Sequence, residues 1–245
     1  MEPNHEAMQR AKEMIAHSRS LVFFGGAGVS TASGIPDFRS ADGLYHTMKD
    51  AKYAPEYYFS HEFSVDKPDE FADFVRTCIR SYDVAPSGAH LTLARWEREG
   101  RLSAVITQNI DSLHQKAGSE RVLEVHGNMS DIYCPQCGYT MPTEEYMQGT
   151  GRVICPVCGK LMRPRVILYG EALDPVVFNA AMHAVAQADT LIVGGTSLVV
   201  YPAAGLVDLY RGHQLILINR DPTPADSRAD VVLQGNIAEI LPALD

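Results

Sequence analysis

Four short runs of consecutive apolar residues stand out along the chain, and each run ends in glycine or polar residues. The runs occupy residues 20–26, 102–109, 190–197 and 214–220. Because Val, Ile, Leu and Phe take neighbouring positions, each run is typical of a parallel strand that is buried on both faces. Stretches suited to helices precede the runs, for example residues 89–100 and 175–189. The alternation predicts an α/β fold with helices on both sides of a parallel sheet.

Polar or small residues lie where each of the four expected strands ends. They are Asp37, Phe38 and Arg39 after the first run, Gln108, Asn109, Ile110 and Asp111 after the second, Gly195, Thr196 and Ser197 after the third, and Asn219 after the fourth. In an open parallel sheet, ligands bind outside the carboxyl ends of the strands. We therefore predict a ligand crevice at this edge.

The glycines after the first run suggest which ligand this is. The spacing of Gly26 and Gly28 suits a phosphate-binding turn, but Thr31 stands where the dinucleotide fingerprint has its third glycine. This pattern indicates that the ligand is a nucleotide, but it does not match the site of an ordinary dehydrogenase. A hydride-transferring oxidoreductase is therefore a weak alternative.

Two stretches interrupt the strand and helix pattern. Residues 40–84 read as a loop followed by helix, rich in aromatic residues, and residues 128–165 contain little apolar material. Too few apolar residues are present in the second stretch to form a core unaided. We interpret both stretches as insertions into the sheet domain.

Four of the five cysteines form two Cys-x-x-Cys pairs, Cys134 with Cys137 and Cys155 with Cys158, separated by 17 residues. This is the two-knuckle spacing of a tetrahedral zinc site. Four thiolates leave no open coordination position, so the predicted zinc is structural. A pair of redox dithiols is the competing interpretation, but no thioredoxin-like context accompanies it. Cys78 is expected to be a buried small apolar residue.

The composition limits the classes of partner and compartment. With 21 Lys and Arg against 30 Asp and Glu, the formal charge is −9, which argues against a protein that binds the nucleic-acid backbone. The first 20 residues carry charges throughout and contain no signal-like apolar stretch, and no run approaches the length of a membrane span. Paired free cysteines suit a reducing compartment, so we expect a cytoplasmic protein with no membrane or nucleic-acid partner.

His126 follows a short apolar segment just before the cysteine insertion. Near a carboxamide, carboxylates and a phosphate turn, it suits a general base acting on a nucleotide. Together these residues resemble the sirtuin family of NAD-dependent protein lysine deacylases. The motifs are GAGVSTASGIPDFR (26–39), TQNIDSLHQKAG (107–118), HG (126–127), the four cysteines, GEAL (170–173), GTSLVVYPAA (195–204) and IN (218–219).

The resemblance covers nearly the whole chain and implies one minimal, bacterial-like catalytic core over residues 1–245. It implies a Rossmann-like NAD domain formed by residues 1–39, 85–127 and 166–245, a loop and helical insertion at 40–84, and an inserted small zinc-ribbon module at 128–165. NAD would be the co-substrate, one zinc would be structural, and acylated-lysine proteins or peptides would be the partners. We expect a monomer.

The resemblance also implies which residues bind NAD. Gly26, Ala27, Gly28 and Thr31 would line the pyrophosphate turn; Gly195, Thr196 and Ser197 would meet the phosphates and ribose; Asn219 and Arg220 would meet the adenosine ribose; Asp37, Phe38 and Arg39 would close over the nicotinamide end; Gln108 and Asn109 would hold the nicotinamide ribose; Ile110 and Asp111 would hold the carboxamide. Phe38 would shield the reactive ribose carbon from water.

By the same resemblance, the catalytic residues are His126, Asn109 and Asp111. The acyl oxygen would attack the ribose carbon that carries nicotinamide, and an alkylimidate-type intermediate would form. His126 would then act as general base on a ribose hydroxyl. The products would be free lysine, nicotinamide and O-acetyl-ADP-ribose.

The substrate peptide would add as a strand through the backbones of two loops. The residues expected to bind the peptide and its acyl-lysine are Phe38, Ile167, Tyr169, Gly170, Glu171, Leu198 and Val199, with His126 in the tunnel wall. An apolar tunnel favours acetyl and other uncharged acyl groups. Deacylases that prefer acidic acyl groups share a Tyr-x-x-Arg pair, which this chain lacks.

Three departures from the family pattern bear on substrate preference. Gly25 stands where a hydroxyl residue is usual, Tyr169 where Phe is common, and Arg165 reverses a charge near the expected channel entrance. The alternatives left open are a mono-ADP-ribosyltransferase, a longer-chain deacylase and, outside enzymes, a zinc-ribbon adaptor.

Overall fold

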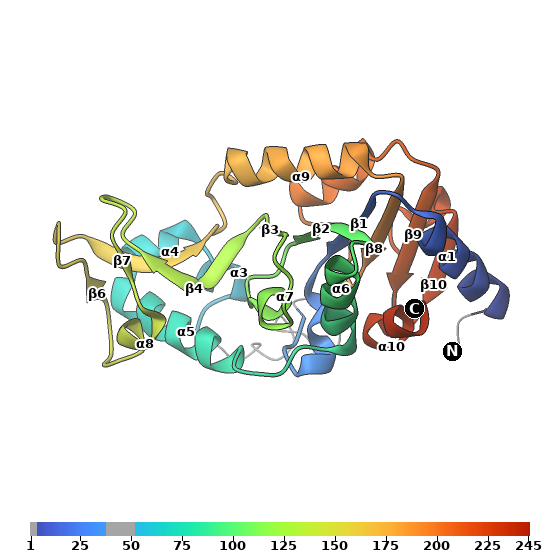
Figure 1. Ribbon diagram of the computed structural model, residues 1–245. Coiled ribbons are helices and arrows are strands. Elements are labelled where there is room, and N and C mark those ends of the chain that lie inside the picture. Colours follow the sequence, from blue (N-terminus) through green and yellow to red (C-terminus); the bar gives the residue numbers. More distant parts are fainter. Residues whose placement is uncertain (1–3, 38–51) are drawn as a thin grey trace.

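The computed structural model describes residues 4–37 and 52–245. Phe38, Arg39 and the start of the predicted insertion at residues 40–84 lie outside the described residues. The main element is a six-stranded, all-parallel sheet with the order β10-β9-β8-β1-β2-β3 (Figure 1). Its strands are β1 (Leu21–Gly25), β2 (Leu102–Thr107), β3 (Val122–Glu124), β8 (Thr190–Gly194), β9 (Gln214–Asn219) and β10 (Val231–Gln234).

The strand order places a topological switch point between β1 and β8. From β1, the chain builds outward first through β2 and β3 and then, on the other side, through β8, β9 and β10. This is the strand order of a doubly wound dinucleotide-binding sheet, in which the ligand crevice opens at the switch point. The prediction of a Rossmann-like parallel sheet is confirmed.

Both faces of the sheet are buried, because successive side chains of a strand point to opposite sides. Leu21 and Phe23 belong to the core under α1, α6 and α10, whereas Val22 and Phe24 belong to the core under α9 and η3. Figure 1 shows α9 on one side of the sheet and α6 with α10 on the other. The helices are α1 (His5–His17), α6 (Gly88–Arg98), α7 (Leu113–Lys116), α9 (Pro175–Gln187) and α10 (Ile237–Ala243), with the short 3₁₀ helices η1 (Ala27–Val29), η2 (Thr31–Ser33), η3 (Ala203–Leu209) and η4 (Asp226–Arg228).

A smaller unit, which we call the small module, lies at the other end of the molecule (Figure 1). Its antiparallel sheet has the order β5-β4-β7-β6 and packs with four helices around a third core. Gly127 at the start of β4 pairs with Val166 at the end of β7, so the chain enters and leaves this sheet at neighbouring positions. The elements are α3 (Pro55–Tyr58), α4 (His61–Asp66), α5 (Pro68–Ser81), β4 (Gly127–Tyr133), β5 (Thr140–Met141), α8 (Thr143–Tyr146), β6 (Val153–Ile154) and β7 (Leu161–Val166).

Among the helices of residues 4–37 and 52–245, none combines the length and apolar character that a membrane crossing requires.

Candidate active site

A cavity of about 1040 Å³ opens at the carboxyl edge of the main sheet and extends to the small module. Most of the predicted site residues line it: Gly26, Ala27, Gly28, Thr31, Asp37, Gln108, Asn109, Ile110, Asp111, His126, Ile167, Tyr169, Gly170, Glu171, Gly195, Thr196, Ser197, Asn219 and Arg220. Leu198 and Val199 do not line it, and the side chain of Leu198 is buried in the apolar core. Segments far apart in the sequence therefore meet at one crevice.

The turns that follow β1 and β8 touch through their backbones at the switch point. The Gly28 amide donates to the Gly195 carbonyl over 2.8 Å. A Cβ atom on Gly28 would lie 2.8 Å from the Cα atom of Gly195, and Gly195 itself has a φ of +61°. Glycine is required at both positions because backbone atoms occupy the space of a side chain. The two turns that border the crevice are therefore held at a fixed distance from each other.

A buried chain of hydrogen bonds joins the first turn to the end of β2. The Asn109 amide Nδ2 donates to Ser30 Oγ over 3.0 Å, and Ser30 Oγ donates to Asp111 Oδ2 over 2.6 Å. The Leu113 amide donates to Asp111 Oδ1 over 2.9 Å. Burial raises the pKa of Asp111, and these hydrogen bonds act against that rise.

Sequence reasoning missed Ser30. Its hydroxyl is fully buried and lies on the cavity, where it connects two residues that were predicted as catalytic. The signal available in the sequence was its place directly after the glycine turn, on the strand edge where the other polar groups gather.

The ends of β2, β8 and β9 are also joined by side-chain hydrogen bonds. Gln108 Nε2 donates to Thr196 Oγ1 over 2.9 Å. The Asn219 carboxamide accepts from the Thr196 amide over 3.0 Å and donates to the carbonyl oxygens of Thr196 and Asp221 over 2.8 and 3.2 Å. Both Nδ2 hydrogens are therefore used, so only the second lone pair of Oδ1 remains for a ligand hydroxyl.

His126 lies where the main sheet meets the small module. Its Nδ1 atom is 3.0 Å from the Gln108 carbonyl oxygen. Because a carbonyl can only accept, Nδ1 carries the proton, and Nε2 of the neutral ring carries a free lone pair. Burial lowers the pKa of His126 below its usual 6.5, although the bond to Gln108 acts in the opposite direction. The ring is therefore neutral near pH 7 and can accept a proton at Nε2.

The loop after β7 is fastened by the Glu171 carboxylate. Arg163 donates to both carboxylate oxygens over 2.6 and 2.7 Å, the Leu168 amide donates over 2.9 Å, and His61 Nδ1 lies 2.9 Å away. Burial alone would raise the pKa of Glu171, but these hydrogen bonds lower it to about 2. The side chain of this predicted peptide-binding residue thus holds the loop, and the backbone contact expected of it stays a prediction.

Arg165 does not lie on this cavity. Its exposed guanidinium pairs with Asp131 over 2.6 Å and lies 4.0 Å from the centre of the Tyr133 ring. Arg165 instead lines a second groove on the small module, and its predicted place near the entrance of the acyl-lysine channel stays a prediction.

One wall of the cavity was not predicted. Helix α5 contributes Phe74, Thr77 and Cys78 among others, and Tyr82 follows directly after its last turn. Burial raises the pKa of Cys78 to about 12, so this thiol stays protonated and acts as a small apolar group, as expected.

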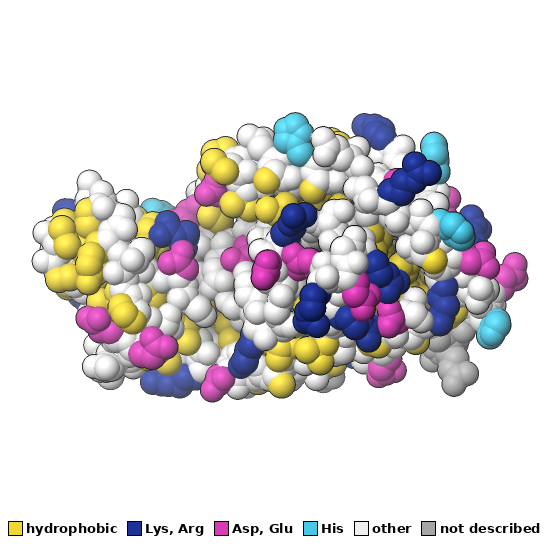
Figure 2. All heavy atoms as spheres, viewed as in Figure 1, with side chains coloured by type: hydrophobic (Ala, Val, Ile, Leu, Met, Phe, Trp, Pro, Cys, Tyr) yellow, Lys and Arg dark blue, Asp and Glu magenta, His cyan; other side chains and the backbone are white. Residues whose placement is uncertain are grey.

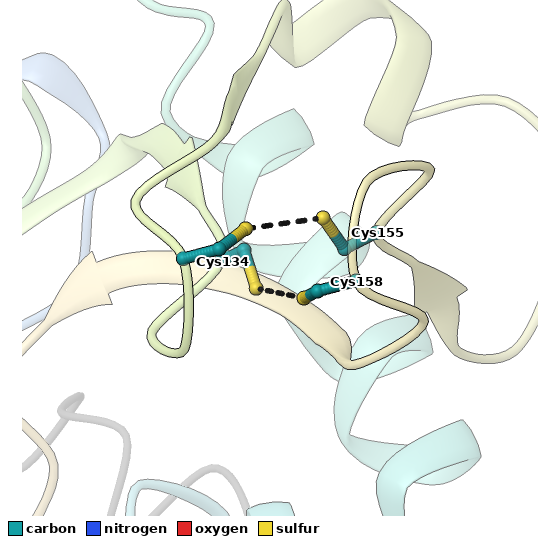
Figure 3. A group of neighbouring side chains, drawn as sticks. Cys134, Cys155 and Cys158 are labelled. Atoms are coloured by element: carbon teal, nitrogen blue, oxygen red, sulfur yellow. Dashed lines mark hydrogen bonds between the residues drawn. The ribbon is translucent and has the colours of Figure 1, made fainter.

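The four paired cysteines converge in the small module. Their Sγ atoms all lie within 4.8 Å of one another, with the closest pairs, Cys134 with Cys158 and Cys137 with Cys155, at 3.4 and 3.6 Å (Figure 3). A tetrahedral zinc with bonds of about 2.3 Å to sulfur separates its ligands by roughly 3.8 Å. The donor set and its spacing therefore fit one zinc ion.

Comparisons with known proteins agree with this geometry. The model of the Sir2 family matches residues 26–202. An NAD-dependent protein deacetylase of Clostridium perfringens is 47% identical over 238 residues, which are 96% of this chain and 97% of that protein. One from Cutibacterium acnes is 47% identical over 236 residues, which are 95% and 96% of the two chains.

Solved structures give the same result. One, described as a structural basis for the mechanism and regulation of Sir2 enzymes, matches with a TM-score of 0.86 and 38% identity over 98% of this chain and 97% of that chain. A Sir2 variant with a deacetylated peptide and 3′-O-acetyl ADP-ribose matches with a TM-score of 0.86 and 34% identity over 97% and 96% of the two chains.

Proposed function

The chain belongs to the Sir2 family of NAD-dependent protein deacetylases, and from this premise we propose how its own residues remove an acetyl group from a protein lysine. NAD and one water molecule are consumed, and the products are the free lysine, nicotinamide and O-acetyl-ADP-ribose. The observation that carries the proposal is the His126 ring. Its Nδ1 proton is donated to the Gln108 carbonyl, and within residues 4–37 and 52–245 its Nε2 lone pair has no hydrogen-bond partner on the wall of the cavity.

In this proposal NAD lies along the carboxyl edge of the main sheet. Its pyrophosphate meets the backbone of the turn at Gly26, Ala27, Gly28 and Thr31, with Gly195, Thr196 and Ser197 on the opposite side. Amide groups near a short helix start suit an anion. The adenosine ribose meets Arg220 and the remaining lone pair of Asn219 Oδ1. Asp37, Phe38 and Arg39 stay predicted to close over the nicotinamide end.

The nicotinamide end meets the Asn109, Ser30 and Asp111 chain. Asp111 and the backbone of Ile110 hold the carboxamide, while Gln108 and Asn109 hold the ribose. Because Ser30 and the Leu113 amide fix the Asp111 carboxylate, this group is ordered before the ligand binds. The acyl oxygen attacks the ribose carbon that carries nicotinamide, and nicotinamide leaves. His126 then removes the proton of a ribose hydroxyl, and this hydroxyl attacks the acyl carbon of the resulting alkylimidate-type intermediate.

The acetylated peptide enters between the loop at 167–171 and the loop after β8. Ile167 and Tyr169 line the acyl-lysine channel, and the backbones of Gly170, Glu171, Leu198 and Val199 bind the peptide as an added strand. Leu198 has a φ of +54° and a buried side chain, which leaves its backbone as the part available to a peptide.

A zinc ion bound by Cys134, Cys137, Cys155 and Cys158 supplies a cross-link between the two hairpins of the small module. The cluster lies in that module and not among the residues of the main cavity. Its role is therefore structural. We also propose domain boundaries at 127/128 and 165/166, since the chain enters and leaves the small sheet there.

The test is turnover of an acetyl-lysine peptide with NAD. We expect nicotinamide release that depends on the acetyl group, formation of acetyl-ADP-ribose, and a loss of about 10²- to 10⁴-fold in kcat for His126→Ala. The unacetylated peptide is the control. If nicotinamide is released and protein is labelled without any acetylated peptide, the mono-ADP-ribosyltransferase is favoured instead.

A panel of propionyl, butyryl, succinyl and myristoyl peptides with the same sequence separates a deacetylase from a longer-chain deacylase. The adaptor alternative requires that no acyl peptide is turned over. We further propose a cytoplasmic protein that binds no nucleic acid, because cysteines that bind zinc must stay reduced and the formal charge is −9. We also propose that it is a monomer. Sedimentation of the purified protein checks the oligomeric state.

A further inference from the structure

A second groove, separate from the main cavity, runs along the outer side of the small module. Its volume is about 840 Å³, and it lies between α4, strands β6 and β7 and the loop at 170–172. Figure 2 shows hydrophobic side chains gathered on the end of the molecule that carries β6 and β7. Two apolar side chains in the groove are unusually exposed: Val65 is 61% exposed and Ile154 is 50% exposed.

The groove adjoins the main cavity, in which the acyl-lysine is proposed to bind. Val166, Ile167, Gly170 and Glu171 line both spaces, so the loop after β7 is the rim between them. This rim is held firmly by the Glu171 and Arg163 pair. An extended chain covers about 3.3 Å per residue. A peptide that binds across the rim therefore brings residues a few positions from its acyl-lysine into the groove.

The groove carries more positive than negative side chains. Arg152, Lys160, Arg163 and Arg165 line it, with Glu171 as the one carboxylate in its wall among the described residues. The three arginines already pair with Asp69, Glu171 and Asp131. Lys160 has no ion pair with any residue of 4–37 and 52–245, and it is exposed.

The rest of the surface has the opposite charge balance, since the whole chain has a formal charge of −9. An acidic peptide is therefore repelled by most of the molecule and attracted to this groove. The exposed Val65 and Ile154 add a place for an apolar side chain beside the charge. The positive charge and the exposed apolar side chains therefore both favour a peptide segment with an acidic and an apolar residue.

We propose that this groove binds the part of the protein substrate that flanks the acyl-lysine, and that it prefers a segment with an acidic and an apolar residue. The proposal rests on the proposed function, because the flanking segment reaches the groove only when the acyl-lysine occupies the main cavity. Lys160 and Val65 are then specificity-determining residues for protein substrates.

The experiment compares three acetyl-lysine peptides with NAD. One is short, one carries flanking extensions with acidic and apolar residues on both sides of the acyl-lysine, and one carries Gly/Ser extensions of equal length on both sides. We expect KM for the acidic peptide to be about fivefold lower than for the Gly/Ser peptide, which is the scale of a favourable exposed ion pair with added apolar contact.

The variant Lys160→Glu should abolish this preference without changing KM for the short peptide. Arg10→Glu on α1 is the matched control, because it makes the same charge change on another face. Zinc content is measured for each variant, since Lys160 lies near the cysteine cluster. Val65→Ser is the second variant, and it should reduce the preference two- to threefold with full zinc.

The outcomes separate the two proposals. If the short peptide is not turned over, the proposed function fails. If the short peptide is turned over but the acidic and Gly/Ser extensions give equal KM, the groove proposal is overturned. Equal effects of Lys160→Glu and Arg10→Glu would also overturn it, because the preference would then come from net charge and not from the groove.

Discussion

The two parts of the molecule that border the cavity are held together in different ways. Every residue of β1 and β8 is buried, and cores lie on both faces of the main sheet. In the small module, β5 and β6 have only two residues each, and the apolar core is shared with α3, α4 and α5. The main sheet thus supplies fixed backbone groups, whereas the small module depends on specific cross-links to keep its shape.

Arg76 of α5 is one of these cross-links. Its side chain is almost fully buried, and it donates to the carbonyl oxygens of Tyr146 and Gly151 over 2.9 and 2.8 Å. It also pairs with Asp73, which accepts from the Gly151 amide. The opposite side of α5 lines the main cavity. The part of the small module that carries Tyr146 and Gly151 is therefore connected to the main cavity through α5.

Loss of the zinc ion should produce the largest difference in stability between the main sheet and the small module. Cys155→Ser removes one thiolate, and structural zinc in small domains stabilises the folded state by about 10–16 kcal/mol. We expect the variant to lose its zinc, the small module to unfold and deacetylation to fall below detection. Zinc analysis and amide hydrogen exchange check this, with protection kept in β1 and β8.

Cys78→Ser is the control for this prediction, because Cys78 lies outside the cluster and should leave one zinc per chain. Full activity of Cys155→Ser without zinc would contradict the structural role of the metal. Unfolding of the main sheet together with the small module would show that the two parts are not independent.

The corresponding change on the sheet side is Gly28→Ala. The new Cβ would lie 2.8 Å from Gly195 Cα and 2.9 Å from its carbonyl oxygen, and neither backbone atom can move as a side chain can. Overpacking of this kind costs about 1–3 kcal/mol. Because the two turns are forced apart, we expect KM for NAD to rise at least ~10-fold while zinc content is unchanged.

Gly205→Ala is the matched control, since its new Cβ would meet only the Tyr201 ring at ordinary distances of 3.7 Å or more. Thermal unfolding and NAD titration of both variants decide the outcome. If Gly28→Ala binds NAD as the wild type does, the contact of the two turns has no part in the nucleotide site.

The main sheet was more accessible to sequence reasoning than the small module, for a physical reason. Strands buried on both faces leave consecutive apolar residues, so β1, β2, β8 and β9 could be predicted. Strands β3 and β10 were missed, because they contain three and four residues and are only partly buried. Such short segments carry no periodicity that separates them from loops.

The site was predictable where residues follow strands and unpredictable where it depends on contacts across the chain. The cysteine spacing predicted the four-cysteine cluster, and the strand ends predicted that Asn109 and Asp111 lie on the crevice, which they line together with His126. Nothing in the sequence pairs Arg163 with Glu171 or directs Arg165 away from the cavity, because these contacts arise from the β7 loop folding back. The placement of Phe38 and Arg39 stays a prediction.

Removal of Arg76 should weaken the small module by a smaller amount. Arg76→Ala leaves the buried carbonyl oxygen of Tyr146 without its donor, at a cost of about 1–3 kcal/mol, and also removes the hydrogen bond to the part-buried Gly151 carbonyl. We expect faster amide exchange in the small module, unchanged exchange in the main sheet, and a several-fold higher KM for peptide with kcat retained. Arg80→Ala on the exposed side of α5 is the control and should change none of these. Equal loss of protection in both parts would contradict the assignment.

The last prediction concerns how activity depends on pH through His126, which lies between the two parts. Burial lowers the pKa of His126 below 6.5, so the base stays neutral above that pH and becomes protonated as pH falls through the lowered value. Glu171 on the small-module side has its pKa lowered to about 2, against 4.5 for an ordinary glutamate. Its contribution to stability is fully present above pH 4.5 and is lost only as pH falls toward 2.

Activity and rim stability should therefore separate on acidification. We expect kcat/KM to decline reversibly below pH 6.5, approaching tenfold per pH unit once His126 is mostly protonated, while the loop at 167–171 keeps its amide protection down to pH 5. Wild-type kcat/KM and exchange are measured on the same samples, with His126→Ala as the variant that should lose this pH dependence. A decline that instead follows the loss of protection would place its cause in the small module and not in the base.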